Sequence, residues 1–174
     1  MAQVPIHPAI VHFPIALAVV GALAEVVHLV LRKPWLRWMG PILLTVALMG
    51  AVGAYFTGNA AEDAVEDQGV PEKAIGGHEQ SGTIAMASIA LAALLSWATR
   101  PKDRGLPVAA AVAVIAAGIT IYTGFLGGEL VYVHGAGQVA PAGQTGAGRG
   151  QGAEGARESG GEHEGREHSG GDRD

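Results

Sequence analysis

The segment AIVHFPIALAVVGALAEVVHLVL, residues 9–31, decides the fold class because it is apolar over nearly its whole length. A helix needs about 20 such residues to cross about 30 Å of hydrocarbon at about 1.5 Å per residue. Similar segments follow at residues 36–57, 82–98 and 106–126. None shows the period-2 alternation of a membrane β-strand. The sequence therefore predicts an all-α protein, an antiparallel four-helix transmembrane bundle.

Charged residues lie mostly outside these segments. Of the 174 residues 49% are hydrophobic and 16% are charged, and the mean hydropathy is +0.29. A soluble bundle would need a polar face on each helix, so the pattern favours a membrane domain over residues 1–135. Residues 136–174 are rich in glycine, glutamate and histidine. We expect them to form a disordered tail, because they have too few apolar side chains to offset the entropy of ordering.

Several classes of function have no support in the residues. The sequence has no cysteine, which excludes disulfides, iron–sulfur ligation and covalent attachment of c-type haem. It contains no P-loop, G-x-S-x-G or H-E-x-x-H motif. The net charge of −5 comes mostly from the tail and does not indicate a nucleic-acid partner. We therefore expect an electron carrier or a membrane subunit rather than a stand-alone enzyme.

The distribution of basic residues predicts an orientation. Two short turns, LRKPWLRW at residues 31–38 and ATRPKDRG at residues 98–105, are basic, whereas the middle connection at residues 59–81 has six acids and one lysine. The positive-inside rule then places the two turns in the cytoplasm of a bacterium and both termini outside its inner (plasma) membrane. Trp35, Trp38 and Trp97 lie at the same edge, where tryptophan anchors helices to the interface.

Small residues mark the expected packing surfaces of the second and fourth helices. They let helix backbones approach closely where lipid supplies no hydrophobic drive for association. The glycines concerned are Gly50, Gly53, Gly58, Gly118, Gly124 and Gly127. In the middle connection, Asn59 is a residue type that caps helices, so we expect a separate short amphipathic helix to begin there.

Histidines gather at the predicted outer face. His7 and His12 lie near the start of the first helix, His78 precedes the third helix, and His134 follows the fourth. Histidine is rare at membrane depth without a role, and neutral imidazole binds haem iron or metal ions. These four residues are the candidate cofactor ligands. His7 and His12 diverge by about 140° on an ideal helix, so the pairing favoured for ligation is His12 with His78 or His134.

Carboxylates accompany the histidines. Glu79 follows His78, and Glu129 lies shortly before His134. Either acid can orient an imidazole or ligate a harder metal directly. A metal site would therefore draw on His12, His78, His134, Glu79 and Glu129. The alternative is that both acids are solvated residues at helix ends.

The sequence contains two further groups of polar residues. Glu25 and His28 form E-x-x-H inside the first helix; we interpret Glu25 as an interior polar contact to Arg32 or His28, with a proton relay as the alternative. His163 and His168 lie in the tail, where a tract rich in histidine and glutamate can hold Zn²⁺ or Cu²⁺ weakly. We interpret the tract as a solvated tail.

Four stretches of the sequence resemble one family. HPAIVHFPIAL at residues 7–17, TGNAAED at 57–63, GHE at 77–79 and GGELVYVHG at 127–135 are similar to the bacterial predicted membrane proteins of domain-of-unknown-function family 2231. The resemblance implies a four-helix membrane domain whose activity is not established. Some members are joined to Rieske-type or c-type haem domains, which implies redox work by analogy.

These observations support three hypotheses. The first is a b-type cytochrome-like protein that binds haem b at its outer, periplasmic face and exchanges electrons with a periplasmic redox protein or a quinone. The second is a non-redox module that binds Cu or Zn. The third is a structural subunit of a larger membrane complex. The bilayer is a partner in each case, and a homo-oligomer is compatible with all three.

Overall fold

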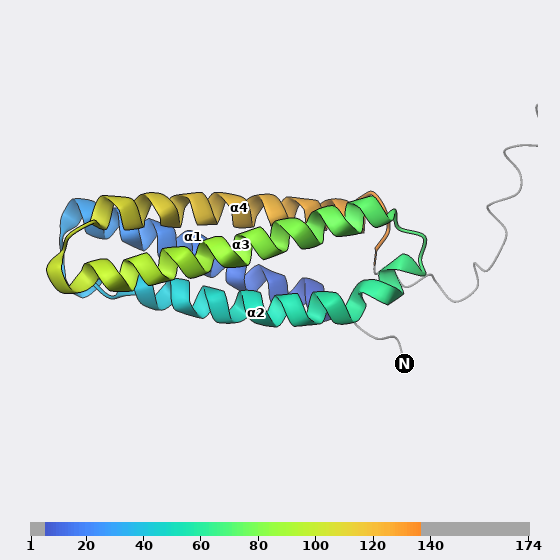
Figure 1. Cartoon of the computed structure of the whole chain (residues 1–174), viewed down its shortest axis with the longest axis horizontal. Coiled ribbons are helices and arrows are strands. Elements are labelled where there is room, and N and C mark those ends of the chain that lie inside the picture. Colours follow the sequence, from blue (N-terminus) through green and yellow to red (C-terminus); the bar gives the residue numbers. More distant parts are fainter. Residues whose placement is uncertain (1–5, 137–174) are drawn as a thin grey trace, which may run out of the picture. The chain divides into compact units, whose positions relative to one another are not determined.

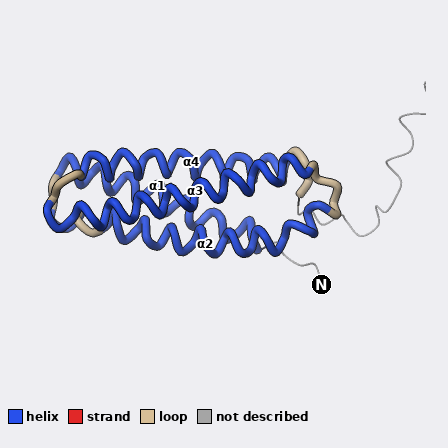
Figure 2. Tube along the Cα trace, in the orientation of Figure 1, coloured by secondary structure: helices blue, strands red, loops and turns tan. Residues whose placement is uncertain are grey.

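A computed structural model describes residues 6–136, and these residues form a bundle of four long helices (Figure 1). The long helices are α1 (Ile6–Leu31), α2 (Met39–Glu66), α3 (Glu72–Thr99) and α4 (Leu106–Tyr132). Two short 3₁₀ helices, η1 (Pro34–Leu36) and η2 (Arg100–Lys102), lie in the turns before α2 and α4. Figure 2 shows helices joined by short loops and no strand in the described part of the chain. The all-α prediction is confirmed.

Successive helices run in opposite directions and enclose a core of small side chains. Helices α1 and α3 each pack against α2 and α4 and stand diagonally opposite each other. Alanines dominate the buried core, together with Leu44 and Ile89. Small side chains let the helices approach closely, which is how membrane helices gain van der Waals contact without a hydrophobic drive. The core alanines are Ala18, Ala22, Ala47, Ala92, Ala93, Ala113, Ala116 and Ala117.

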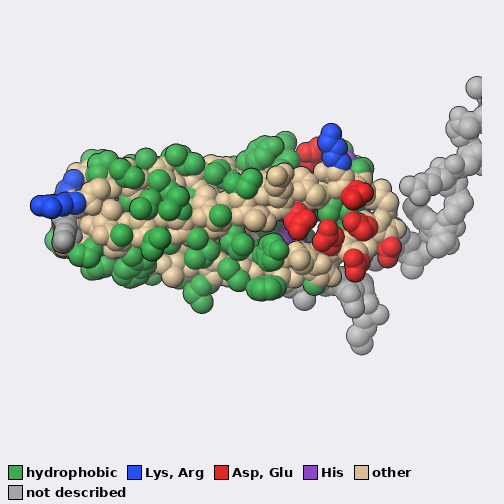
Figure 3. Space-filling view, viewed as in Figure 1, with side chains coloured by type: hydrophobic (Ala, Val, Ile, Leu, Met, Phe, Trp, Pro, Cys, Tyr) green, Lys and Arg blue, Asp and Glu red, His purple; other side chains and the backbone are tan. Residues whose placement is uncertain are grey.

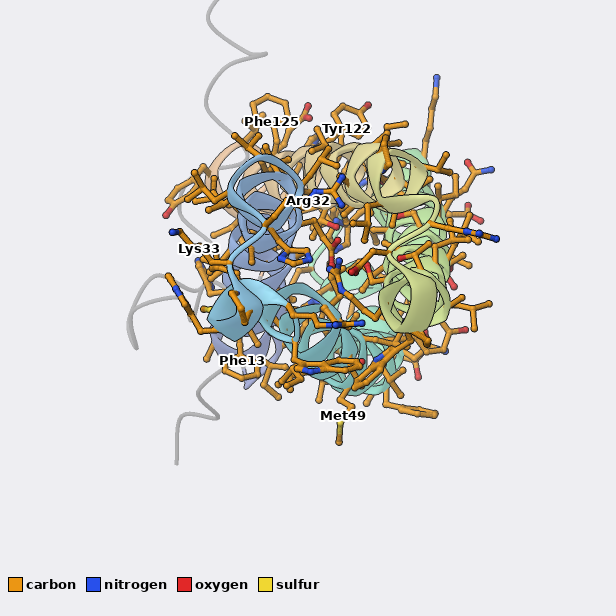
Figure 4. The ribbon with its side chains drawn as sticks, turned by 90° about the vertical axis from the view of Figure 1, so that its left-hand side faces the viewer. Phe13, Arg32, Lys33, Met49, Tyr122 and Phe125 are labelled. Atoms are coloured by element: carbon orange, nitrogen blue, oxygen red, sulfur yellow. The ribbon has the colours of Figure 1, made fainter. Side chains whose placement is uncertain are left out.

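Large apolar side chains face outward instead. Figure 4 looks along the bundle and shows Phe13, Met49, Tyr122 and Phe125 pointing away from the ring of helices; their exposed fractions lie between 54% and 70%. In the space-filling view apolar side chains cover the length of the bundle (Figure 3). All four long helices are long and apolar enough to cross a membrane. An apolar exterior around a tightly packed interior is what a hydrocarbon solvent favours.

The two ends of the bundle differ in charge. We call the end with the connections 32–38 and 100–105 the basic-turn end, and the end with the α2–α3 connection the acidic-turn end. Figure 3 shows blue Lys and Arg side chains at the tip of the former and a group of red Asp and Glu side chains at the latter. The two termini of the described chain also lie at the acidic-turn end (Figure 1).

The helices are longer at the acidic-turn end than the hydropathy pattern predicts. α2 continues to Glu66 rather than ending near residue 57, and α3 begins at Glu72 rather than near residue 82. The separate helix capped by Asn59 was wrong, because Asn59 lies inside α2. The chain turns only at Gly69, which has φ +79°, and Pro71. A left-handed glycine followed by a proline ends a helix more effectively than polar residues do.

Tryptophans lie at the basic-turn end, where the sequence predicted them. Trp38 and Trp97 pack with ring centroids 5.5 Å apart, and Trp97 Nε1 donates to Thr45 Oγ1 at 3.0 Å. Trp35 is 69% exposed.

The prediction that glycines mark the packing surfaces of α2 and α4 is confirmed in part. A side chain at Gly50, Gly58, Gly124 or Gly127 would meet a neighbouring helix, whereas Gly53 and Gly118 face open space. The predicted disordered tail lies outside the described residues.

Candidate functional site

Two histidines meet across the bundle at the acidic-turn end. His7 on α1 and His78 on α3 belong to diagonally opposite helices, yet their ring centroids are 6.2 Å apart, with an angle of 84° between the ring planes. Both side chains are half-buried. His78 is brought here because α3 begins six residues before it, so that it lies inside the helix rather than ahead of it. The diagonal pair is therefore a product of the longer helix.

A hydroxyl group orients the His7 ring. His7 Nδ1 lies 3.2 Å from Thr57 Oγ1 on α2. The Thr57 hydroxyl donates its proton to the carbonyl oxygens of Gly53 and Ala54, each 3.1 Å away. When the hydroxyl donates to one of these carbonyls it accepts from His7, and in that tautomer the imidazole proton lies on Nδ1 and the lone pair on Nε2. A hydrogen bond of this kind typically fixes the tautomer of a ligating histidine.

A glycine faces each ring. A Cβ atom at Gly58 would lie 3.1 Å from His7 Cε1, and one at Gly127 would lie 3.0 Å from His78 Cε1. Both distances are shorter than ordinary van der Waals contact, so an alanine at either position would push the ring aside. α2 and α4, the helices without a histidine of the pair, thus leave the space that the rings occupy. Ser81 Oγ and Thr123 Oγ1 add a hydrogen bond of 2.6 Å between α3 and α4 nearby.

The structure places the other predicted ligands elsewhere. His12 is exposed, with its Nδ1 2.6 Å from Pro8 O on its own helix. The favoured pairing of His12 with His78 is therefore not seen, since the partner of His78 is His7. The expected divergence of His7 and His12 is present, but His7 is the one that turns inward. Within residues 6–136, no three His, Asp or Glu side chains are grouped to hold a metal ion.

Glu129 and His134 lie together at the end of α4. They line a hollow of about 340 Å³ with residues of α3, and His134 Nδ1 is 3.3 Å from Glu129 O. Glu79 lines a different hollow of about 370 Å³ with Glu62, Glu66 and Glu72. Glu62 is half-buried, and the other acids are exposed. His163 and His168 lie outside the described residues.

A second group of polar side chains lies at the basic-turn end, and it is buried. Glu25 on α1 and Arg100 on η2 form an ion pair with exposed fractions of 1% and 0%. His28 on α1 is 4% exposed, and Ser96 on α3 is 0% exposed. We call these four residues the buried polar cluster. The guanidinium group of Arg100 points into the bundle, although Arg100 itself lies in an end turn rich in basic residues.

The neighbourhood is shaped to hold the ion pair. A Cβ atom at Gly40, the second residue of α2, would overlap the Glu25 carboxylate. Arg37 donates from Nη2 to the carbonyl oxygen of Arg100 and lies 3.9 Å from Asp103 Oδ1. Glycine at residue 40 therefore makes room for the carboxylate, while Arg37 holds the turn that carries Arg100.

The prediction that Glu25 makes an interior polar contact is confirmed, but its ion-pair partner is Arg100 and not Arg32. Arg32 is exposed, and its Nε donates to Leu29 O at 3.0 Å, because the left-handed backbone at Arg32, with φ 51°, turns the chain away from α1. Glu25 stands out in the sequence because it is the one acid in the apolar segment 9–31. Its partner could not be found from the sequence, because Arg100 lies 75 positions away among basic residues that look alike.

The fold defines a class of protein, a small four-helix membrane protein with polar groups enclosed at each end of its bundle. The chain belongs to the family described as predicted membrane protein, domain of unknown function 2231, whose model matches residues 3–140. The resemblance noted in the sequence is confirmed. No curated protein and no solved structure matches the chain.

Proposed function

We propose that this protein is a membrane redox carrier of the b-type cytochrome kind, in which His7 and His78 would hold one haem. The observation that carries the proposal is the meeting of these two rings across the bundle at 6.2 Å. Two imidazoles that share one metal ion, each nitrogen about 2 Å from it, have ring centres about 6 Å apart. Haem suits a two-histidine site because its porphyrin supplies the other four nitrogens.

The surroundings of the pair support this assignment. In the tautomer in which His7 Nδ1–H donates to Thr57, the Nε2 lone pair is free for a metal. His78 Nδ1 is buried without a hydrogen-bond partner among the described residues. On α2 and α4, the space beside Gly58 and Gly127 is already taken by the two rings, so a bound haem would need further room there. These helices must part at the acidic-turn end to admit it. The bound haem would supply one-electron chemistry, while the protein holds it and excludes water.

The proposal includes an orientation in the bacterial inner membrane. The basic turns face the cytoplasm, and the acidic-turn end with the histidine pair faces the periplasm. A quinone in the bilayer or a periplasmic redox protein would then exchange electrons with the pair. Since the chain has no cysteine, single cysteines test this directly. An impermeant maleimide added to intact spheroplasts should label Glu66→Cys and leave Lys33→Cys unlabelled until the membrane is opened; the reverse pattern overturns the orientation.

Haem titration of the purified full chain in detergent tests the ligands. Wild type should develop a Soret band and redox-sensitive α and β bands at one haem per chain. His7→Ala and His78→Ala should each abolish low-spin binding, whereas the matched controls His12→Ala and His134→Ala should bind as wild type does. Equal spectra in all four variants would contradict the assignment. A colourless protein that contains Cu or Zn, lost in the same two variants, would favour the non-redox metal module instead.

A further inference from the structure

The buried polar cluster at the basic-turn end is separate from the histidine pair. Eighteen positions divide His7 from Glu25 on α1, which is about 27 Å at about 1.5 Å per residue. Charged groups inside a membrane segment are costly and mark functional positions more often than chance. The cluster combines a carboxylate, an imidazole, a guanidinium and a hydroxyl from three parts of the chain. It therefore needs an explanation of its own.

Most of the unpartnered polar atoms in the described chain gather here. Eight buried side-chain atoms lack a hydrogen-bond partner within the protein, and seven of them lie at this end. They are Glu25 Oε2, His28 Nδ1, His28 Nε2, Arg37 Nε, Ser96 Oγ, Arg100 Nε and Arg100 Nη1. Each such group destabilises the folded protein when it stays unpaired. Because these buried atoms include both donors and acceptors, bound water is the simplest ligand that satisfies both.

The form of the ion pair argues against a purely structural role. A structural arginine–carboxylate pair typically joins two nitrogens to two oxygens, which satisfies both side chains. Here one nitrogen, Arg100 Nη2, bonds one oxygen, Glu25 Oε1. Glu25 Oε2 and the remaining guanidinium donors stay free for other partners. The pair thus holds the carboxylate in place while leaving half of it available.

Glu25 and His28 are placed to share a proton. They lie three residues apart on α1, so they project from the same face of the helix. The charged groups whose fields reach His28 are Arg100 on η2, Asp103 in the turn before α4, and Glu25 on its own helix. A proton taken up by the imidazole therefore meets one guanidinium and two carboxylates. Arg37 and the exposed Asp103 carry the polar contacts from the cluster to the surface.

We propose that Glu25, His28 and Ser96 form a hydrated proton-binding site that exchanges protons with the aqueous phase at the basic-turn end. In uptake, a hydronium ion gives its proton through bound water to a ring nitrogen of His28, forming one N–H bond and leaving water behind. The added positive charge lies in the field of the Glu25 and Asp103 carboxylates, while the Arg100 guanidinium offsets one of these two negative charges. Release reverses these steps. The ligands are a proton and water, and the site does not depend on haem.

Nuclear magnetic resonance of the full chain, ¹⁵N-labelled at histidine and held in lipid nanodiscs, tests this proposal. His28→Gln assigns the His28 signals, and exposed His12 serves as the reference for a ring in contact with water. In the wild-type protein, the His28 ring shifts should change as the pH is lowered from about 8 to about 4, and its ring N–H should exchange within the mixing time in D₂O. Unchanged shifts with a ring proton protected for hours would overturn the proposal.

A variant pair tests the part of the carboxylate. Glu25→Gln keeps the size of the side chain but removes its charge, and should slow His28 N–H exchange by about tenfold or more. Glu79→Gln, an exposed acid at the far end, should leave the exchange unchanged. Equal exchange in both variants would overturn the role of Glu25. Because the wild-type measurement stands by itself, the proposal stays testable if Glu25→Gln does not fold.

Discussion

The two ends of the bundle differ in the kind of polar group they contain and in how deeply it is buried. At the acidic-turn end, His7 and His78 are half-buried imidazoles set against glycines, and the Thr57 hydroxyl contacts one of them. At the basic-turn end, Glu25 and Arg100 carry opposite charges and are almost fully buried. A half-buried pair can be entered by a large ligand, whereas a fully buried one admits only water and protons. The contrast explains why we assign a cofactor to one end and a proton to the other.

The largest expected effect is on the ion pair. Arg100→Ala should lower the free energy of unfolding by about 3–5 kcal/mol, because it leaves the Glu25 carboxylate buried without its partner. Reversible unfolding in mixed micelles measures the change. Arg104→Ala, an exposed arginine in the same turn, is the matched control and should change stability by less than about 0.5 kcal/mol. Similar losses in the two variants would mean that Arg100 is not paired in the membrane.

A smaller loss should follow from filling the space at residue 40. Gly40→Ala introduces a Cβ that overlaps the Glu25 carboxylate, and overpacking of this kind costs about 1–3 kcal/mol. Gly53→Ala, in the same helix but facing open space, should stabilise slightly because alanine favours helix by up to about 1 kcal/mol. The same unfolding assay compares them. Stabilisation by both substitutions would show that the carboxylate does not occupy the predicted place.

At the other end, removing the hydroxyl beside His7 should weaken the cofactor site without unfolding the bundle. Thr57→Val takes away the acceptor for Nδ1–H and should reduce haem affinity by about 10–100-fold. Thr120→Val is the control, since its hydroxyl bonds only to the Ala116 carbonyl on its own helix. Haem titration followed in the Soret region measures both. An unchanged affinity in Thr57→Val would remove Thr57 from the site.

The smallest effect is expected at the tryptophan anchor. Thr45→Val removes the acceptor of Trp97 Nε1–H, and the loss of one neutral hydrogen bond costs about 0.5–1.5 kcal/mol. The emission maximum of tryptophan should also shift, because the indole then seeks another partner at the interface. Thr99→Val, whose hydroxyl bonds the Ser96 carbonyl on its own helix, serves as the control. An identical emission spectrum and an unchanged free energy of unfolding would show that this hydrogen bond does not stabilise the basic-turn end.

The sequence predicted which histidines lie at this end of the bundle, but it did not predict which two of them meet. Hydropathy and topology brought His7, His12, His78 and His134 to one end of the bundle. The favoured pairing nevertheless used His12, because the third helix was expected to begin after His78. The polar residues 72–81 gave no hydropathy signal for a helix, yet they continue α3 beyond the apolar segment. One extra stretch of helix turned His78 toward His7.

The sequence by itself determined the class of this protein. Four apolar segments of membrane-spanning length, basic turns and interfacial tryptophans predict the helices and their order, since each follows from local composition and the needs of a hydrocarbon solvent. Only the tertiary structure decided the contacts inside the bundle. Whether His7 meets His78, and which of several arginines reaches Glu25, depends on helix rotation and register. Those are set by the packing of small residues across helices far apart in the sequence, and no single segment encodes them.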